Sequence, residues 1–315
     1  MARLCATWTL RVTVLIALFG NAAFAADSWI RLSNQNFDLY SDLPHEKAAI
    51  LLTRLDQARQ ALGNISAPIP TSAQPIRVIA FRDLDEYRQY STDSVSTAYF
   101  LHSKHRDYIV IGLNRIDPYT PVVHEYTHFW IHQQHHHLPR WLDEGLADVY
   151  STVEEKNGTV RIGLPLENRL EWLRMDGLAY SLPTLFQFQQ YHLTSMSSIS
   201  PRSRFYAESW ILTHMLRFSP FYSPHFSEFI QQLDTGASTQ EALSTAFHKS
   251  EAEVQKDLTH YLNAEKIPTH VLRAREPQLA SSFASTELDP SDSAAVLDDL
   301  LATLKPSKNL EATVP

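Results

Sequence analysis

The chain has 315 residues, with 27 basic and 35 acidic side chains, and a formal net charge of −8 at neutral pH. Strong nucleic-acid binders present basic patches, so this acidic balance argues against nucleic acid as a partner. The hydrophobic fraction of 44% is typical of a globular protein with a packed core.

Residues 1–25 match the pattern of a secretory signal peptide. Two arginines supply its positive start, an apolar run covers 12–19, and Ala23-Phe24-Ala25 fits a cleavage site. The run is too short to cross a bilayer, so we expect no membrane span in the mature chain. The single cysteine lies inside this segment, which would leave the mature chain without disulfides. We therefore expect an exported protein of the bacterial periplasm or the extracellular space.

The first part of the remaining chain alternates strand and helix patterns. Apolar and polar residues alternate in the short runs, whereas leucines recur at helical spacing in the long one. The predicted elements are strands at 28–32, 36–40 and 76–81, helices at 42–63 and 84–90, and a hairpin made of 97–101 and 108–113. The hairpin directly precedes the segment with the strongest chemical signal.

That segment reads His124-Glu125-Tyr126-Thr127-His128, an HExxH run in a stretch whose prolines and apolar residues favour a helix. Residues four apart lie on one helical face, so His124 and His128 can offer two imidazoles to one ion. Glu125 follows His124 directly and therefore lies beside that face of the helix, where its carboxylate can reach a water bound to the ion. This pattern is typical of a zinc hydrolase, with one Zn²⁺ ion as cofactor.

Such a site needs a third protein ligand, and its fourth position must stay open for water. Ile131 and Gln134 occupy the positions where a metzincin would carry glycine and histidine, which excludes that motif. His132 lies four residues after His128, but side chains four apart are rotated slightly around the helix axis at each step. The imidazole of His132 would therefore point past the ion. The remaining candidate is Glu144, beyond a loop that lets the chain fold back, with Asp143 as a lesser alternative.

Two further features surround this site. Asp148 lies one helical turn after Glu144 and could accept the outer N–H of a ligand histidine, which would orient that ring. The cluster His135-His136-His137 follows the HExxH helix. We interpret it as a solvated turn, because the neighbouring site already has its ligands.

HEYTH followed by WLDEGLADVY resembles the gluzincin metallopeptidases, in which HExxH precedes a glutamate ligand in a helix reading roughly W-L-x-E-G-x-A. The chain is more closely similar to the peptidase MA-like group of secreted bacterial proteins, many of which carry tetratricopeptide repeats. The resemblance covers most of residues 28–265. It implies zinc held by His124, His128 and Glu144, and it matches Asp148 to an acidic residue that supports a zinc histidine in relatives of thermolysin.

The resemblance also implies a catalytic tyrosine. Tyr206 occupies the place where zinc aminopeptidases and leukotriene hydrolases carry one, and a neutral phenol is suited to donate to an oxyanion. His214 is an alternative donor, and a tyrosine of the core is the alternative interpretation of Tyr206 itself. The implied fold is α+β: a thermolysin-like α/β lobe with the HExxH helix, followed by an all-helical lobe.

The sequence supports that division independently, because its pattern turns helical from about residue 165. Helices are predicted at 166–175, 183–190, 204–218, 224–233, 239–247 and 251–262, after a hairpin at 152–162 whose turn is Asn157-Gly158. The expected segments are the signal peptide at 1–25, the α/β lobe with the zinc site at 26–165, the helical lobe at 166–265 and a tail at 266–315.

In the tail, 294–304 is amphipathic and resembles one helix of a tetratricopeptide repeat. We interpret it as a remnant of such a repeat or as a docking helix for a protein partner, and a disordered tail is the alternative.

These patterns predict a secreted peptidase that acts on peptides or proteins. Glu125 would take the proton of a zinc-activated water, and Tyr206 would stabilise the oxyanion. The G-x-M-E-N segment with which zinc aminopeptidases bind a free amino group does not occur between 76 and 123, so we expect an endopeptidase. The gluzincin resemblance implies that its substrate lies along the 97–101 edge, and an ordinary hairpin of the core is the alternative interpretation of these residues. Two other functions stay open: a secreted scaffold with a structural zinc site, and a zinc hydrolase of a non-peptide bond.

Overall fold

The computed structural model describes residues 28–65, 74–91, 93, 95–113, 119–135, 138–188, 200–273 and 282–311, with side chains up to 305. The expected signal peptide, His136 and His137 lie outside these residues. Among the described helices, none combines the length and the apolar character that crossing a membrane requires.

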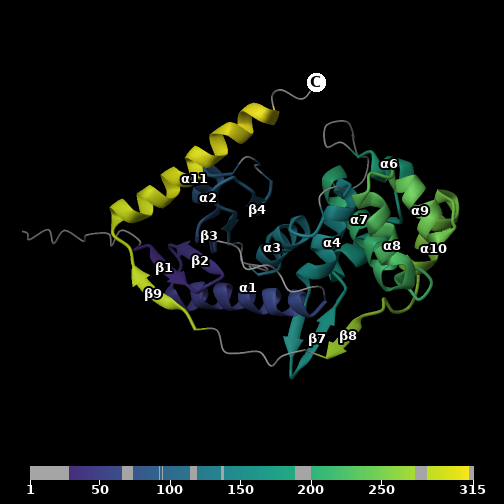
Figure 1. Cartoon of the computed structure of the whole chain (residues 1–315), viewed down its shortest axis with the longest axis horizontal. Coiled ribbons are helices and arrows are strands. Elements are labelled where there is room, and N and C mark those ends of the chain that lie inside the picture. The colour runs from purple at the N-terminus through teal and green to yellow at the C-terminus, as the bar shows by residue number, and fades with distance from the viewer. Residues whose placement is uncertain are drawn as a thin grey trace, which may run out of the picture.

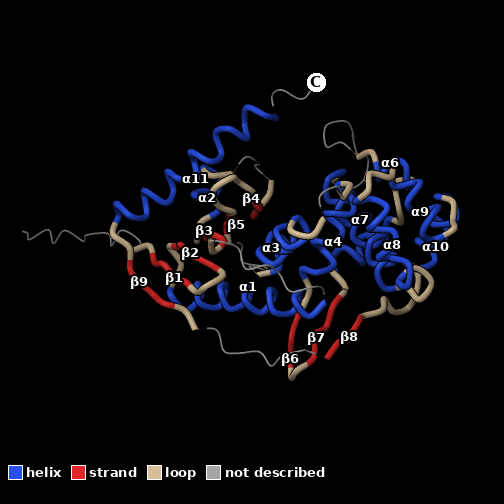
Figure 2. The backbone as a smooth tube through the Cα atoms, in the orientation of Figure 1, coloured by secondary structure: helices blue, strands red, loops and turns tan. Residues whose placement is uncertain are grey.

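The predicted α+β class is confirmed, and its largest sheet has six strands (Figures 1 and 2). They are β1 (Ile30–Ser33), β2 (Phe37–Ser41), β3 (Ile76–Phe81), β4 (Ala98–Leu101), β5 (Tyr108–Gly112) and β9 (Ala284–Glu287). Their order across the sheet is β4-β5-β3-β2-β1-β9. The pairs β2–β3 and β3–β5 are parallel, and the other pairs are antiparallel, so β4 forms one edge as an antiparallel strand.

Helices cover both faces of this sheet. Successive strand residues point to opposite faces, so Val78 packs with the core beneath α1 (His45–Ile65), while Ile79 packs on the other side. The second face is covered by α2 (Leu84–Gln89) and α11 (Pro290–Glu311) (Figure 1). Burial on both faces explains why β3 and β5 are almost continuously apolar.

The carboxy-terminal segment belongs to this lobe, which corrects the expectation of a separate tail at 266–315. β9 adds to the sheet beside β1, and α11 buries Val296 and Leu300 against the aromatic face formed by residues such as Trp29. Asp299 of α11 also accepts a hydrogen bond from the Tyr108 hydroxyl at 2.6 Å. The apolar stripe that suggested a partner-docking helix is therefore occupied by the protein's own sheet.

The second half of the chain is mainly helical, as predicted. Two helices come first, α3 (Thr120–His132) and α4 (Arg140–Ser151). The later helices are α5 (Glu167–Asp176), α6 (Leu182–Phe186), α7 (Pro201–Phe218), α8 (Phe226–Asp234), α9 (Thr239–Phe247) and α10 (Glu251–Leu262), with a 3₁₀ turn at Ser223–His225. Along the chain, these later helices are flanked by the strands of a small antiparallel sheet. The predicted hairpin, β6 (Glu154–Lys156) and β7 (Thr159–Ile162), is joined by β8 (His270–Arg273) in a small antiparallel sheet.

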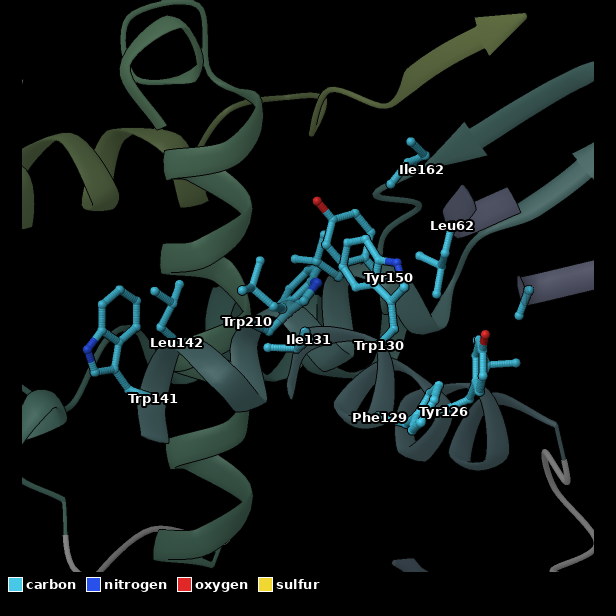
Figure 3. Close-up of a cluster of buried hydrophobic side chains, with 14 of the residues drawn as sticks. Leu62, Tyr126, Phe129, Trp130, Ile131, Trp141, Leu142, Tyr150, Ile162 and Trp210 are labelled. Atoms are coloured by element: carbon cyan, nitrogen blue, oxygen red, sulfur yellow. The ribbon is translucent and has the colours of Figure 1, made fainter. Parts of the chain in front are cut away.

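Helices α3, α4 and α7 pack around a shared apolar core that contains Ile131, Leu142 and Trp210 (Figure 3). Fully burying a side chain of this size contributes about 1.5–3 kcal/mol to stability. The close contact of α4 with α7 depends on Gly145, where a Cβ atom would lie 2.6 Å from the Ser209 carbonyl oxygen. The glycine of the E-G-L-A-D segment thus lets α4 lie directly on α7, which places Glu144 opposite the start of α7.

Candidate metal centre

His124 and His128 of α3 and Glu144 of α4 bring three donor atoms together. The two Nε2 atoms are 3.2 Å apart, and Glu144 Oε2 lies 3.4 Å from His124 Nε2 and 3.5 Å from His128 Nε2. Ligands of a tetrahedral zinc ion with bonds of about 2.0–2.1 Å are separated by roughly 3.3 Å. The three donors therefore match one face of a tetrahedron of the size that zinc requires, and they form a group that could hold a metal ion.

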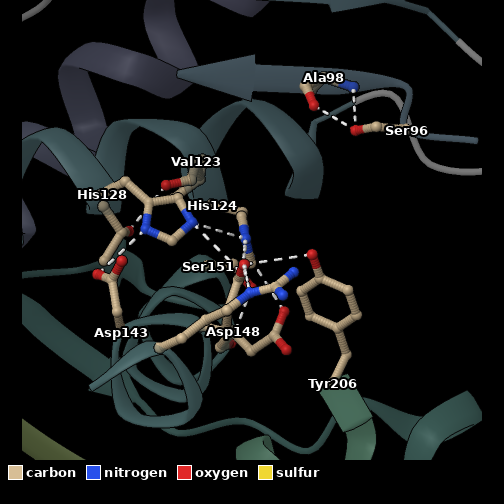
Figure 4. A network of polar contacts seen from close by, with 12 residues as sticks. Ser96, Ala98, Val123, His124, His128, Asp143, Asp148, Ser151 and Tyr206 are labelled. Atoms are coloured by element: carbon tan, nitrogen blue, oxygen red, sulfur yellow. Dashed lines mark hydrogen bonds and ion pairs between the residues drawn. The ribbon is translucent and has the colours of Figure 1, made fainter. Parts of the chain in front are cut away.

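The outer nitrogens of both histidines are held by carboxylates (Figure 4). His124 Nδ1 lies 3.0 Å from Asp148 Oδ1, and His128 Nδ1 lies 3.2 Å from Asp143 Oδ1. An ionised carboxylate can only accept, so each Nδ1 donates its proton, and each Nε2 can present a lone pair to a metal ion once it carries no proton. Two lone pairs and a carboxylate oxygen within 3.5 Å repel one another unless a proton or a metal cation lies between them. This donor set fits a divalent metal ion.

The contact that we predicted for Asp148 is present, whereas the supporting role of Asp143 was missed. The sequence suggested Asp143 only as an alternative ligand, but its oxygens face the outer nitrogens of His128 and His132. The second oxygen of Asp148 forms an ion pair with Arg169 of α5, another residue that the motifs did not indicate. Both contacts depend on how helices cross, which residue spacing within one helix does not determine.

Asp143 and Glu144 remain ionised at neutral pH. Burial opposes the charged form of Asp143, but hydrogen bonds with His128 and His132 lower its pKa to about 2. Burial likewise opposes the charge on Glu144, and contacts with His124 and His128 hold its pKa below the ordinary value. The cluster therefore offers negative charge to a dication at neutral pH.

His132 takes part in a second group with His128 and Asp143, and its Nε2 lies 3.2 Å from Asp143 Oδ2. That group would use Nδ1 of His128, the atom that donates to Asp143 when Nε2 serves as a ligand. The two groups therefore compete for His128 rather than forming independent sites. In the neighbouring loop, His135 Nδ1 lies 2.6 Å from Asp234 Oδ2, so this histidine contacts α8.

Glu125 lies beside the donor atoms. Burial, the largest influence, raises the pKa of its carboxyl, and Glu144 raises it further. His124, His128 and a hydrogen bond from the backbone of Phe100 act in the opposite direction. A carboxylate with a raised pKa is a better proton acceptor, which suits a general base next to a metal-bound water.

Tyr206 reaches the site from α7 (Figure 4). Its hydroxyl donates a hydrogen bond to Glu144 Oε1 at 3.2 Å. Burial and the charge of Glu144 raise the pKa of the phenol, so it stays a proton donor at neutral pH. The side chain is only partly buried and its hydroxyl meets a candidate ligand, which distinguishes it from an ordinary core tyrosine.

His214, the alternative oxyanion donor, does not reach this site. The ring is fully buried, with Nε2 2.9 Å from the Gly163 carbonyl oxygen and Nδ1 2.7 Å from the Tyr261 hydroxyl. A carbonyl can only accept, so Nε2 donates and Nδ1 accepts from the tyrosine. His214 therefore belongs to the core, where both of its nitrogens are satisfied.

Acid should destabilise the protein through His214. Burial lowers the pKa of this ring from 6.5 to about 4, so its contribution to stability is complete above pH 6.5 and is lost as the pH falls toward 4. Between pH 7 and pH 5 this residue alone should remove about 2 kcal/mol from the free energy of unfolding.

The measurement is denaturant unfolding of the zinc-free protein and of His214→Gln at both pH values. We expect the variant to lose about 2 kcal/mol less than the wild type between them. His105→Gln, at an exposed position, serves as the control and should keep the wild-type pH dependence. An equal loss in wild type and His214→Gln would show that this ring does not titrate on unfolding.

No protein-family model matches this chain, and a search of the curated proteins finds no match. The functional assignment therefore depends on the residues of the site and on their geometry.

Proposed function

We propose that the protein is an exported zinc peptidase that hydrolyses internal peptide bonds. The observation that supports this most is the set of three converging donors, His124, His128 and Glu144, with the Glu125 carboxyl beside them. When bound there, zinc would lower the pKa of a water molecule and polarise the scissile carbonyl. A purely structural site would need no neighbouring base and would usually have a fourth protein ligand.

The chain's own residues have distinct parts in this mechanism. Glu125 accepts the proton of the attacking water and passes it to the leaving amine, a role worth about 10²–10⁴ in rate. The Tyr206 hydroxyl would stop donating to Glu144 and donate instead to the negative oxygen of the tetrahedral intermediate. This stabilisation is worth a factor of about 10²–10³ in kcat. Asp148 and Asp143 keep the two histidines in the tautomer whose Nε2 is free to bind metal.

The edge strand β4 is suited to bind the substrate as an added strand. β4 pairs with β5 on one side, and no other described strand pairs with its second side. Its Phe100 packs against Phe129 of the HExxH helix, with ring centroids 6.1 Å apart, and its backbone contacts Glu125. An extended peptide that added to this edge would therefore pass the candidate metal centre.

The proposal predicts similar cleavage of a decapeptide with a free amino end and of its N-acetylated form. The described acids around the donors already have partners: Asp143 contacts two histidines, Asp148 contacts His124 and Arg169, and Glu125 accepts from the Phe100 backbone. An incoming ammonium group would lose its hydration without a free acid to replace it. We expect kcat/KM values within a factor of about three, measured by mass spectrometry of timed digests.

Each digest is repeated with a chelator, with zinc restored, and with Glu125→Gln. Cleavage should disappear with the chelator and return with zinc. Stepwise release of single residues from the free peptide alone would make the enzyme an aminopeptidase. A zinc-loaded protein that cleaves neither form, nor other unstructured peptides, would overturn the proposed function.

A further inference from the structure

We propose that Arg202 is a positioning residue for Tyr206, and that Asp93 holds Arg202 in place from the segment that leads into β4. This inference rests on the proposed function, in which the Tyr206 hydroxyl stabilises the oxyanion. None of the sequence motifs indicated Arg202 or Asp93.

The contacts join three parts of the chain. Arg202 lies in the first turn of α7, four residues before Tyr206 and therefore on the same helical face. Its guanidinium carbon is 5.8 Å from the centre of the Tyr206 ring, which places the guanidinium within reach of the tyrosine hydroxyl. The same guanidinium forms an ion pair with Asp93, whose carboxylate also accepts from the Val95 backbone N–H at 2.8 Å.

These contacts change what the phenol can do. The Tyr206 hydroxyl donates to Glu144 Oε1 at 3.2 Å, and its lone pairs can accept from the neighbouring Arg202 guanidinium. A hydroxyl that accepts a charge-assisted hydrogen bond becomes a stronger donor, because bonds in a chain polarise one another. Arg202 would therefore both fix the direction of the phenol and strengthen its bond to a developing oxyanion.

A second guanidinium, that of Arg169, lies 5.6 Å from the same ring, but it has a different task. Arg169 forms an ion pair with Asp148, which in turn supports the candidate ligand His124. Replacing Arg169 would therefore disturb the metal centre as well as the tyrosine. Arg202 contacts Asp93 and Tyr206 instead, so its replacement tests the tyrosine without removing a support of the metal ligands.

The competing explanation is that the Arg202–Asp93 ion pair only ties α7 to the segment before β4. In that case the loss caused by Arg202→Met would not depend on whether residue 206 carries a hydroxyl. If Arg202 acts through the phenol, the loss should vanish once the hydroxyl is absent. A double-mutant cycle with Tyr206→Phe separates the two explanations.

The probe is a phosphonamidate peptide, whose tetrahedral phosphorus carries oxygens in the arrangement of the hydrolytic intermediate. Its affinity for the zinc-loaded full chain is measured by calorimetry. We expect Tyr206→Phe and Arg202→Met each to weaken binding about tenfold or more, and the double variant to bind no more weakly than Tyr206→Phe. Arg202→Lys should restore part of the affinity, and Arg161→Met, which breaks an exposed ion pair with Glu154, should change nothing.

The outcomes are distinct. Full additivity in the cycle, with zinc content and thermal unfolding unchanged, would overturn the positioning role and leave the proposed function intact. If Arg202→Met folds poorly, the cycle is run with Arg202→Lys, for which an undiminished affinity would equally contradict a bond specific to the guanidinium. A zinc-loaded wild type that neither binds the phosphonamidate nor cleaves peptides would overturn the proposed function itself.

Discussion

Glu125→Gln is expected to bind one zinc ion per chain and to lose about three orders of magnitude in kcat. The glutamine keeps the size of the side chain, so the donors His124, His128 and Glu144 should stay in place. Its amide cannot accept the proton of the attacking water, which removes the general base. The measurements are zinc content by elemental analysis and kcat on a peptide that the wild type cleaves.

The matched control is Glu171→Gln, which makes the same change at an exposed position of α5 and should leave both quantities at the wild-type level. A Glu125→Gln protein with nearly wild-type kcat would show that another group takes the proton. Loss of zinc together with activity would instead mean that Glu125 itself binds the metal.

His128→Ala is expected to lower zinc affinity by at least about a hundredfold, because it removes one of three protein ligands. His132→Ala makes the same substitution one turn later in α3. It should change zinc affinity less than tenfold, since His132 contacts the supporting Asp143 rather than the three donors. Competition with a chromophoric chelator measures both affinities. An equal loss in the two variants would locate the metal in the second group, with His132 as a ligand.

Local sequence patterns were sufficient for most elements and for the core of the site. The spacing of His124 and His128 on one helix, and of Glu144 and Asp148 on the next, determines which side chains share a face. Gly145 then allows the close helix contact that brings α4 next to α7. The helical spacings are properties of neighbouring residues, which explains why they can be read from the sequence, whereas the contact of Gly145 with α7 joins distant segments and was not predicted.

The features that the sequence did not predict depend on contacts between distant segments. The amphipathic stretch of α11 shows that one face is buried, but only the structure shows that the sheet near Trp29 buries it. Asp143 supports His128 because of the angle at which α3 and α4 cross, and Arg202 meets Asp93 across 109 positions of the chain. Hydrophobic periodicity and motif spacing carry no information about such partners.

Anomalous diffraction at the zinc absorption edge, from crystals grown with one equivalent of zinc, tests the metal centre most directly. We expect one peak about 2.0–2.1 Å from His124 Nε2, His128 Nε2 and Glu144 Oε2, with a water as the fourth ligand. A peak bound instead by His132, Asp143 and Nδ1 of His128, or a fourth protein ligand in place of the water, would contradict a hydrolytic zinc site.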